Sequence, residues 1–386
     1  MPDRSSAGRG ASDEHDLEVD AAIAHDWFVG MYGAERVVEA MWSGLFSPSA
    51  RPDIFTFHAV RNLLPQRLAE AIVRESRLAS LPGLRERGLR GGRWRYLLPY
   101  VPHYFAKLDL EPYDLVISSS HACAFHVRTR PDALHVCYCH TPMRYAWTPE
   151  VDSDRWGVPG FALRAAASRL RRADRAAAWG PDVFVANSSA VRDRIGRFFG
   201  RDAVVVHPPV DVDDFEPSAA KDPGQFLWVG RLIRYKRPDL VVEAFRGLPY
   251  RLVIVGVGPL EKELRRDLPD NVRLVGWASR RDLVSLYAES SGFIHVGEED
   301  FGMSMVEALA SGTPVIGFAR GGAVDIVRPG QDGLLIEQPE PAAVRDAVDR
   351  VAHTRWDPSA LAERARSFSR PMFLRRMREV ILGLYS

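Results

Sequence analysis

The sequence contains little that would carry the chain across a membrane or stabilise it outside the cell. Its 386 residues include only three cysteines, too few for a disulfide framework, which favours a reducing cytoplasm. No apolar run reaches the roughly 20 residues that a membrane-spanning helix needs. Residues 1–20 are polar and have no apolar segment of the kind found in export signals, so they are predicted to form a disordered leader.

Net charge and lysine are also scarce. The 51 Lys+Arg and 50 Asp+Glu residues leave a formal charge of +1, so the molecule as a whole does not attract nucleic acid. Only four of the basic residues are lysines, and a lysine within a motif is therefore more informative than an arginine. Hydrophobic residues at 46% and charged residues at 26% are typical of a globular protein.

Short apolar, β-branched runs alternate with longer amphipathic segments along most of the chain. Strands are predicted at Ala21–His25, Ile54–Val60, Asp114–Ser118, Leu134–His140, Val183–Asn187, Val204–His207, Phe226–Gly230, Arg251–Val255, Val272–Val275, Gly292–Val296, Pro314–Phe318 and Gly333–Ile336. Helices are predicted between them, including Ala34–Leu45, Gln66–Glu75, Pro238–Phe245, Leu260–Leu268 and Met303–Ala310. The alternation predicts an α/β protein with parallel sheets covered by helices on both faces.

A proline-rich segment without hydrophobic periodicity divides the chain near its middle, at Pro208–Pro217. We predict an N-terminal Rossmann-like domain over residues 21–208, a linker over 209–224 and a C-terminal Rossmann-like domain over 225–370. A final helix over 371–386 is predicted to cross back to the N-terminal domain. Ligands of such sheets bind beyond the carboxyl ends of the strands, so chemistry is expected in the cleft between the domains.

The first motif runs from Gly230 to Pro238. A predicted strand ends at Gly230, Arg231 follows directly, and Lys236 precedes a helix opened by Pro238. A planar guanidinium and a point-charge ammonium around a tight loop suit a diphosphate. Taken alone, the segment is more typical of a solvated basic turn.

The second motif runs from Gly297 to Leu309. Glu299 lies in the predicted loop, and Glu307 lies about two turns into the helix that follows. The backbone amides of Gly302, Met303 and Ser304 would be free at the helix N-terminus to bind an anion or a sugar hydroxyl. Acidic residues before a helix can simply complement its dipole, which explains Glu299 well and Glu307 poorly.

Together these motifs resemble the donor site of family 4 retaining glycosyltransferases, which have the two-domain GT-B fold. Gly30–Glu35 stands where such enzymes carry a glycine-rich loop, and Cys139–Tyr145 is similar to a segment of bacterial polysaccharide mannosyltransferases. The sequence departs from the family pattern at Tyr32, where glycine is frequent.

The resemblance implies a role for each motif residue. Arg231 and Lys236 would hold the donor diphosphate, Glu307 the ribose hydroxyls and Glu299 a hydroxyl of the donor sugar. The backbone near Trp277 would border the base.

In the N-terminal domain, the resemblance implies that Gly30 and Gly33 let backbone approach phosphate. His140 would lie near the reacting anomeric centre, although a histidine at a strand end is also typical of a structural role. No metal or cofactor is expected, because cations and a helix N-terminus can stabilise the leaving diphosphate. The Asp211-Val212-Asp213 pair is interpreted as a turn within the linker.

The predicted function is retaining transfer of a sugar from a nucleotide-sugar to a glycan or lipid-linked acceptor, in cell-envelope or exopolysaccharide synthesis. The likeness at Cys139–Tyr145 favours GDP-mannose. The alternatives are another GT-B enzyme, such as a sugar-nucleotide epimerase or a glucan synthase or phosphorylase, and a non-catalytic nucleotide-sugar-binding protein.

Residues 61–107 hold ten basic residues against three acidic ones and are rich in aromatics. They are predicted either to contact an anionic membrane surface or to form a solvated face over an apolar core. The expected location is the cytoplasm, and the first of these alternatives would add peripheral contact at the inner face of the membrane.

Overall fold

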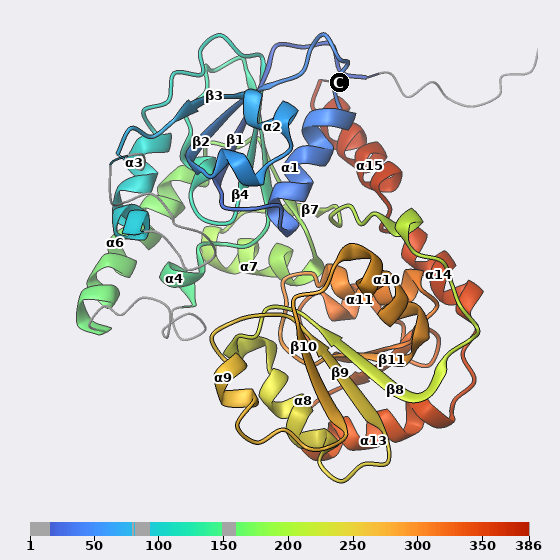
Figure 1. Ribbon diagram of the computed structural model, residues 1–386. Coiled ribbons are helices and arrows are strands. Elements are labelled where there is room, and N and C mark those ends of the chain that lie inside the picture. Colours follow the sequence, from blue (N-terminus) through green and yellow to red (C-terminus); the bar gives the residue numbers. More distant parts are fainter. Residues whose placement is uncertain (1–15, 79–80, 82–92, 149–159, 386) are drawn as a thin grey trace, which may run out of the picture.

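The computed structural model describes residues 16–78, 81, 93–148 and 160–385. Within them the chain forms two α/β domains, the N-terminal one at the top of Figure 1 and the C-terminal one at the bottom. The N-terminal strands are β1 (Ala21–Phe28), β2 (Asp53–Ala59), β3 (Ile72–Glu75), β4 (Leu115–Ser120), β5 (Leu134–Cys139), β6 (Val183–Ala186) and β7 (Ala203–Val205). They form a parallel sheet in the order β3-β2-β1-β4-β5-β6-β7.

The C-terminal domain repeats this topology. Its strands are β8 (Asp222–Val229), β9 (Arg251–Val255), β10 (Val272–Gly276), β11 (Ser290–His295), β12 (Val315–Phe318) and β13 (Gly333–Ile336). They form a parallel sheet in the order β10-β9-β8-β11-β12-β13. In both sheets the strand order reverses beside the first strand, between β1 and β4 and between β8 and β11, and these switch points are where ligands of open α/β sheets bind.

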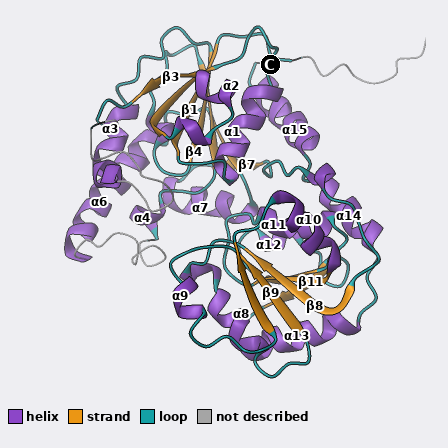
Figure 2. Ribbon diagram, in the orientation of Figure 1, coloured by secondary structure: helices purple, strands orange, loops and turns teal. Residues whose placement is uncertain are grey.

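Helices cover the faces of both sheets, as Figure 2 shows by colour. The N-terminal helices are α1 (Gly33–Gly44), α2 (Gln66–Glu70), α3 (Val101–Phe105), α4 (Arg144–Trp147), α6 (Gly160–Ala177) and α7 (Ser189–Phe199). The others are α8 (Pro238–Phe245), α9 (Glu261–Leu264), α10 (Arg280–Glu289), α11 (Met303–Ala310), α12 (Ala323–Ile326), α13 (Pro341–His353), α14 (Pro358–Arg366) and α15 (Arg370–Leu382). Because helices cover both faces, a central strand such as β4 is buried at every residue.

The chain crosses between the domains twice, at neighbouring points. Val210 forms a β-bridge with Ser369, and the Val210 amide donates to the Phe368 carbonyl at 2.9 Å. After this second crossing α15 packs against α1, and its side chains Phe373 and Met377 belong to the core of the N-terminal domain. Residues from the far end of the sequence thus complete the first domain.

Several predicted boundaries differ from the structure. Residues 1–15 of the predicted leader lie outside the described residues, but Leu17 is buried and its amide donates to Leu45, so the leader does not extend to residue 20. β8 begins at Asp222, inside the predicted linker. The helix predicted over Gln66–Glu75 ends at Glu70, because the β-branched Ile72 and Val73 continue as an edge strand paired with β2.

The helix predicted over Leu260–Leu268 is also shorter than expected. It forms a single turn, α9, over Glu261–Leu264. In the linker, Val212–Asp214 forms a short 3-10 turn, and Asp211 pairs with Arg36 of the N-terminal domain at 3.6 Å.

Candidate active site

The loop after β8 carries the first predicted cations. Arg231 is exposed, whereas the Lys236 side chain is 16% exposed and its Nζ lies 2.6 Å from Glu299 Oε1. Arg237 then takes a left-handed conformation, with φ of 54°, and opens α8 before Pro238. A Cβ on Gly256 would lie 1.8 Å from the Gly230 carbonyl oxygen, so the neighbouring loop approaches Gly230 as only glycine allows.

The loop after β11 brings Glu299 to Lys236. Burial would raise the pKa of Glu299, but the Lys236 ammonium and His295, whose Nε2 is 3.5 Å from Oε1, lower it well below its usual range. Gly302, with φ of 99°, caps α11, so the amides of Met303 and Ser304 occupy the first turn of the helix. The structure therefore brings together Lys236, Glu299 and this helix N-terminus at the β8/β11 switch point.

Glu307 lies within α11 and already has partners. Its Oε1 accepts from Arg280 at 3.0 Å, and its Oε2 accepts from the Tyr287 hydroxyl at 3.0 Å. Arg280 also pairs with Asp214 at 2.7 Å. Each carboxylate oxygen keeps a second lone pair, so Glu307 can still accept a bond from a hydroxyl.

Trp277 lies at the carboxyl end of β10 and is 76% exposed. It borders a hollow of about 290 Å³, together with Arg273, Val275, Ala278, Asp282, Ser285 and Leu286. Because most of its surface is exposed, the indole ring is available to a planar ligand.

The N-terminal side of the site is a cluster of histidines at the β1/β4 switch point. His25 Nδ1 lies 3.0 Å from the Ser119 carbonyl oxygen, and His140 Nε2 lies 2.8 Å from Ser119 Oγ. The ring centroids of His25 and His140 are 5.5 Å and 6.3 Å from that of His121. Burial is the main cause that lowers the pKa of His25 to about 3 and of His121 to about 4, so both rings are neutral near pH 7.

His140, which the resemblance places near the reacting sugar, belongs to this cluster. Its side chain is largely buried, and burial together with His121 and His25 holds its pKa well below the usual range. The more exposed ring belongs to His121, at 21% side-chain exposure. His121 was not predicted as a site residue, although the polar run Ser118–Ser120 directly before it marks the end of a strand beside β1.

Asp26 fixes the loop that carries His121. Its carboxylate accepts four backbone amide bonds, from His121 and Ala122 on Oδ2 and from Cys123 and Ala124 on Oδ1, at 2.7 to 2.9 Å. Burial raises the pKa of Asp26, although the hydrogen bonds from these amides act to lower it. Asp26 was not predicted as a site residue, because its partners lie about 95 residues away in the sequence.

The glycine-rich loop before α1 faces the second domain. A Cβ on Gly33 would lie 3.3 Å from Sδ of Met303, at the start of α11. The Tyr32 ring lies against Gly30, where a Cβ would be 2.8 Å from Tyr32 Cε2. The loop therefore reaches α11, but Tyr32 covers Gly30, where the resemblance expected backbone to approach phosphate.

Four further charged residues, which were not predicted as site residues, join the two domains. Asp300, next to Glu299, bonds Arg144 of α4 and Arg194 of α7. Arg194 also donates to Glu298 at 2.9 Å.

Comparison with known proteins agrees with this arrangement. Residues 31–214 match the family model described as Glycosyltransferase Family 4, and residues 210–368 match the one described as Glycosyl transferases group 1. Among solved structures, Anabaena HepE in complex with UDP aligns with a TM-score of 0.66 at 17% identity, over 94% of this chain and 100% of that one. The lipopolysaccharide outer core galactosyltransferase WaaB in its apo form aligns with a TM-score of 0.65 at 18% identity, over 94% and 99%. At these identities the likeness concerns the fold alone.

Curated relatives match over shorter stretches. A GDP-mannose-dependent alpha-mannosyltransferase of Corynebacterium glutamicum is 37% identical over 150 residues, 36% of this chain and 35% of the relative. One of Mycobacterium tuberculosis is 34% identical over 168 residues, 40% and 44% of the two chains. The chain thus spans less than half of either relative. The fold is that of the GT-B glycosyltransferases. With the two family models matched in succession, the chain belongs to glycosyltransferase family 4, as its motifs predicted.

Proposed function

We propose that the protein transfers a sugar, with retention of anomeric configuration, from a nucleotide-sugar to a hydroxyl of a glycan or lipid-linked acceptor. The observation that carries this proposal is the Lys236–Glu299 ion pair beside the N-terminus of α11, at the β8/β11 switch point. Cations and helix amides suit a diphosphate, and a carboxylate next to them suits a sugar hydroxyl.

The ion pair suggests how the donor is received. A diphosphate would draw the Lys236 ammonium toward itself, and Glu299 would then be free to accept a bond from a hydroxyl of the sugar. When the sugar–phosphate bond breaks, negative charge develops on the leaving diphosphate. Arg231, Lys236 and the α11 amides would stabilise that charge, so no metal ion is required.

Transfer with retention is proposed to use attack from the side of the leaving group. The leaving phosphate then takes the proton of the acceptor hydroxyl. Because burial keeps the pKa of His121 and His140 below the usual range, both rings are neutral and would orient hydroxyls by hydrogen bonds. Neither is proposed to act as a nucleophile.

GDP-mannose is the proposed donor, and the alpha-mannosyltransferases among the curated relatives support it. The purified protein should be screened with GDP-, UDP- and ADP-sugars for a thermal shift and for nucleotide release with and without acceptor. An epimerase would convert the sugar without releasing nucleotide, a phosphorylase would depend on inorganic phosphate, and a binding protein would shift without turnover.

The donor site is tested by substitution in the same screen. Arg231→Ala and Lys236→Ala should abolish the thermal shift given by the donor. Lys262→Ala is the matched control, because Lys262 is an exposed lysine of the same domain. If the two site variants keep the full shift, the diphosphate assignment is wrong.

The proposal extends to a membrane-bound acceptor reached from the cytoplasm. No helix among the described residues is long and apolar enough to cross a bilayer. Exposed apolar side chains gather around β3 with exposed arginines: Leu63, Val73, Leu78, Arg67, Arg74 and Arg77. Such a surface suits an anionic bilayer, which attracts arginine and accepts apolar side chains at its interface.

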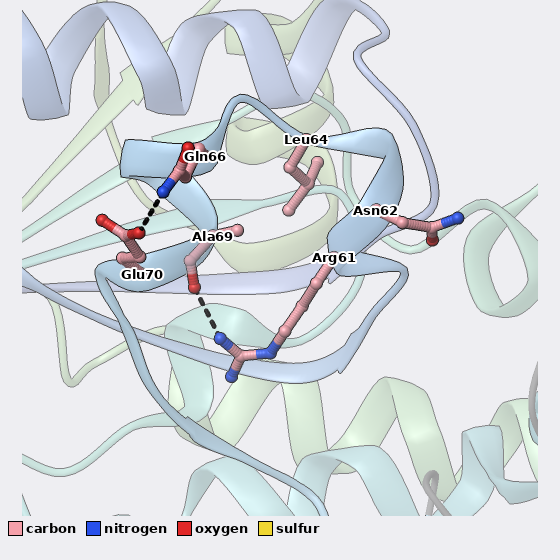
Figure 3. Close-up of a pocket in the computed structure, with 6 residues that line it drawn as sticks. All are labelled: Arg61, Asn62, Leu64, Gln66, Ala69 and Glu70. Carbon is pink, nitrogen blue, oxygen red and sulfur yellow. Dashed lines mark hydrogen bonds between the residues drawn. The ribbon is translucent and has the colours of Figure 1, made fainter.

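Other parts of residues 61–107 serve the fold instead. Phe105 is fully buried, and the Tyr104 hydroxyl donates to the Thr56 carbonyl at 2.8 Å. Arg61 donates to the Ala69 carbonyl at 2.5 Å, beside a hollow of about 460 Å³ that contains none of the predicted site residues (Figure 3). Arg85, Arg87 and Arg90 lie outside the described residues.

Sedimentation with phosphatidylglycerol vesicles at low salt tests the membrane surface. The wild type should sediment, and Arg67→Glu/Arg74→Glu should not. Arg265→Glu, at an exposed arginine of the other domain, should behave as the wild type. A wild type that stays in the supernatant would refute the membrane proposal and leave the donor site untouched.

A further inference from the structure

The loop that carries Glu299 is bound on its other side by the N-terminal domain. Asp300 bonds the guanidinium groups of Arg144 and Arg194, one on each carboxylate oxygen. Arg194 donates a second bond to Glu298 at 2.9 Å. We name these residues, Arg144, Arg194, Glu298 and Asp300, the interdomain clasp. The Asp300 side chain is only 14% exposed, so this contact is well shielded from solvent.

Contacts within the N-terminal domain hold the short helix of Arg144 in place. Arg144 opens this helix, α4, which ends at Trp147. The Trp147 indole donates to buried Asp174 at 2.7 Å and stacks on Phe198 at 4.7 Å between ring centroids. Arg171 donates to the Ala146 carbonyl at 2.6 Å. A side chain supported in this way adds precision to a contact across the interface.

Arg194 is also fixed by its helix. α7 is capped by Ser188 at its N-terminus, where the next residue, Ser189, donates from its amide at 2.7 Å and from its hydroxyl at 2.5 Å to Asp325 of the other domain. His207 Nε2 lies 3.4 Å from the same carboxylate. α7 is therefore bound to the C-terminal domain at its first turn and again at Arg194.

Arg144 contacts both loops that carry the proposed donor residues. Its guanidinium carbon lies 5.0 Å from the centre of the Tyr235 ring, and Tyr235 directly precedes Lys236. Its ion pair is with Asp300, which directly follows Glu299. Its charge also lowers the pKa of His121. Arg144 of the N-terminal domain thus contacts the Lys236 loop and the Glu299 loop, and its charge acts on the histidine cluster.

We propose that the interdomain clasp positions Lys236 and Glu299 for the donor when the two domains come together. Arg144, Arg194 and Asp300 are then positioning residues, which set the geometry of the donor site without binding the donor. The effect on turnover rests on the proposed function, whereas the effect on domain arrangement does not.

The domain arrangement is measured with spin labels on Arg67→Cys and Lys262→Cys, one exposed position in each domain. The three native cysteines are buried, so the labels go to the new sites. The labelled but otherwise wild-type protein should give a narrow distance distribution, and Asp300→Asn should broaden it. Asp300→Glu should restore part of the narrow component. Asp267→Asn, which breaks an exposed ion pair with Arg246 inside one domain, should change nothing.

Kinetics with the donor found in the screen tests the positioning role. Asp300→Asn and Arg194→Gln should each lower kcat/KM for the donor by roughly 10- to 100-fold, as expected when reacting groups are misplaced. The double variant should lose less free energy than the sum of the two single losses, because both substitutions remove the contact that Arg194 and Asp300 share. If Asp300→Asn does not fold, Arg194→Gln carries the test alone.

The outcomes separate the two proposals. An unchanged distance distribution in a folded Asp300→Asn or Arg194→Gln variant overturns the clasp. Altered distances with unchanged kcat and KM overturn its positioning role. A wild type that turns over no nucleotide-sugar overturns the proposed function. The spin-label distances still test whether the interdomain clasp holds the two domains in place.

Discussion

Replacing Asp26 with asparagine tests the scaffold of the histidine cluster. The carboxylate accepts four backbone amides, two on each oxygen, inside a fully buried site. Asparagine keeps one acceptor oxygen and turns an NH₂ group toward the other two amides. Two bonds to a charged acceptor are lost, at about 1.5–3 kcal/mol each. Removal of a buried charge offsets part of this loss, so we expect Asp26→Asn to lower the free energy of unfolding by about 3 kcal/mol.

The loss should be visible in thermal unfolding. For a domain of this size, about 3 kcal/mol corresponds to a fall in Tm of about 6–12 °C. Circular dichroism and calorimetry would follow the transition, and the rate of sugar transfer at low temperature would report the displacement of His121. Asp132→Asn is the matched control, because that carboxylate is 76% exposed and pairs with Arg130 on the surface. If Asp26→Asn melts with the wild type, the four bonds do not contribute as the geometry indicates.

Three other predictions concern stability. Phe373→Ala in α15, at a side chain 2% exposed, should cost about 3–5 kcal/mol in urea unfolding, whereas Tyr385→Ala, at an exposed ring, should cost little. Burial raises the pKa of Glu35 from 4.5 to about 7, so the folded state binds this proton more tightly than the unfolded state does. The free energy of unfolding should therefore fall as pH rises from 4.5 to about 7, and Glu35→Gln should reduce this dependence on pH. Burial lowers the pKa of His135 from 6.5 to about 3, so stability is lost as pH falls through that range, by roughly 1.4 kcal/mol per pH unit. His135→Gln should show a shallower decline; an unchanged acid profile would contradict this account.

Local sequence signals predicted the elements that depend on local physics. Pro238–Phe245 and Met303–Ala310 form helices at the predicted residues, because a proline or a glycine opens each one and an apolar face follows. Gln66–Glu75 was predicted as one helix, but β2 offers its edge to Ile72 and Val73, and pairing outweighs the helical pattern.

Sequence motifs can point to candidate site residues where those residues lie close together in the sequence. Two short motifs, each within one loop and the helix after it, contain Arg231, Lys236, Glu299 and Glu307. The contact between Asp300 and Arg144 joins residues 156 positions apart, and no local pattern encodes it. The roles of His121 and His140 likewise depend on which ring faces outward, and burial decides that only in the folded chain.

The position of α15 has a consequence for synthesis. Phe373, Met377 and Ile381 belong to the core of the first domain but are translated after the whole second domain. The second domain is therefore synthesised while the first still exposes the apolar side chains of α1 that α15 covers. During that interval the nascent first domain depends on chaperones or on its own partial stability, and its final folding step must occur after translation has passed residue 382.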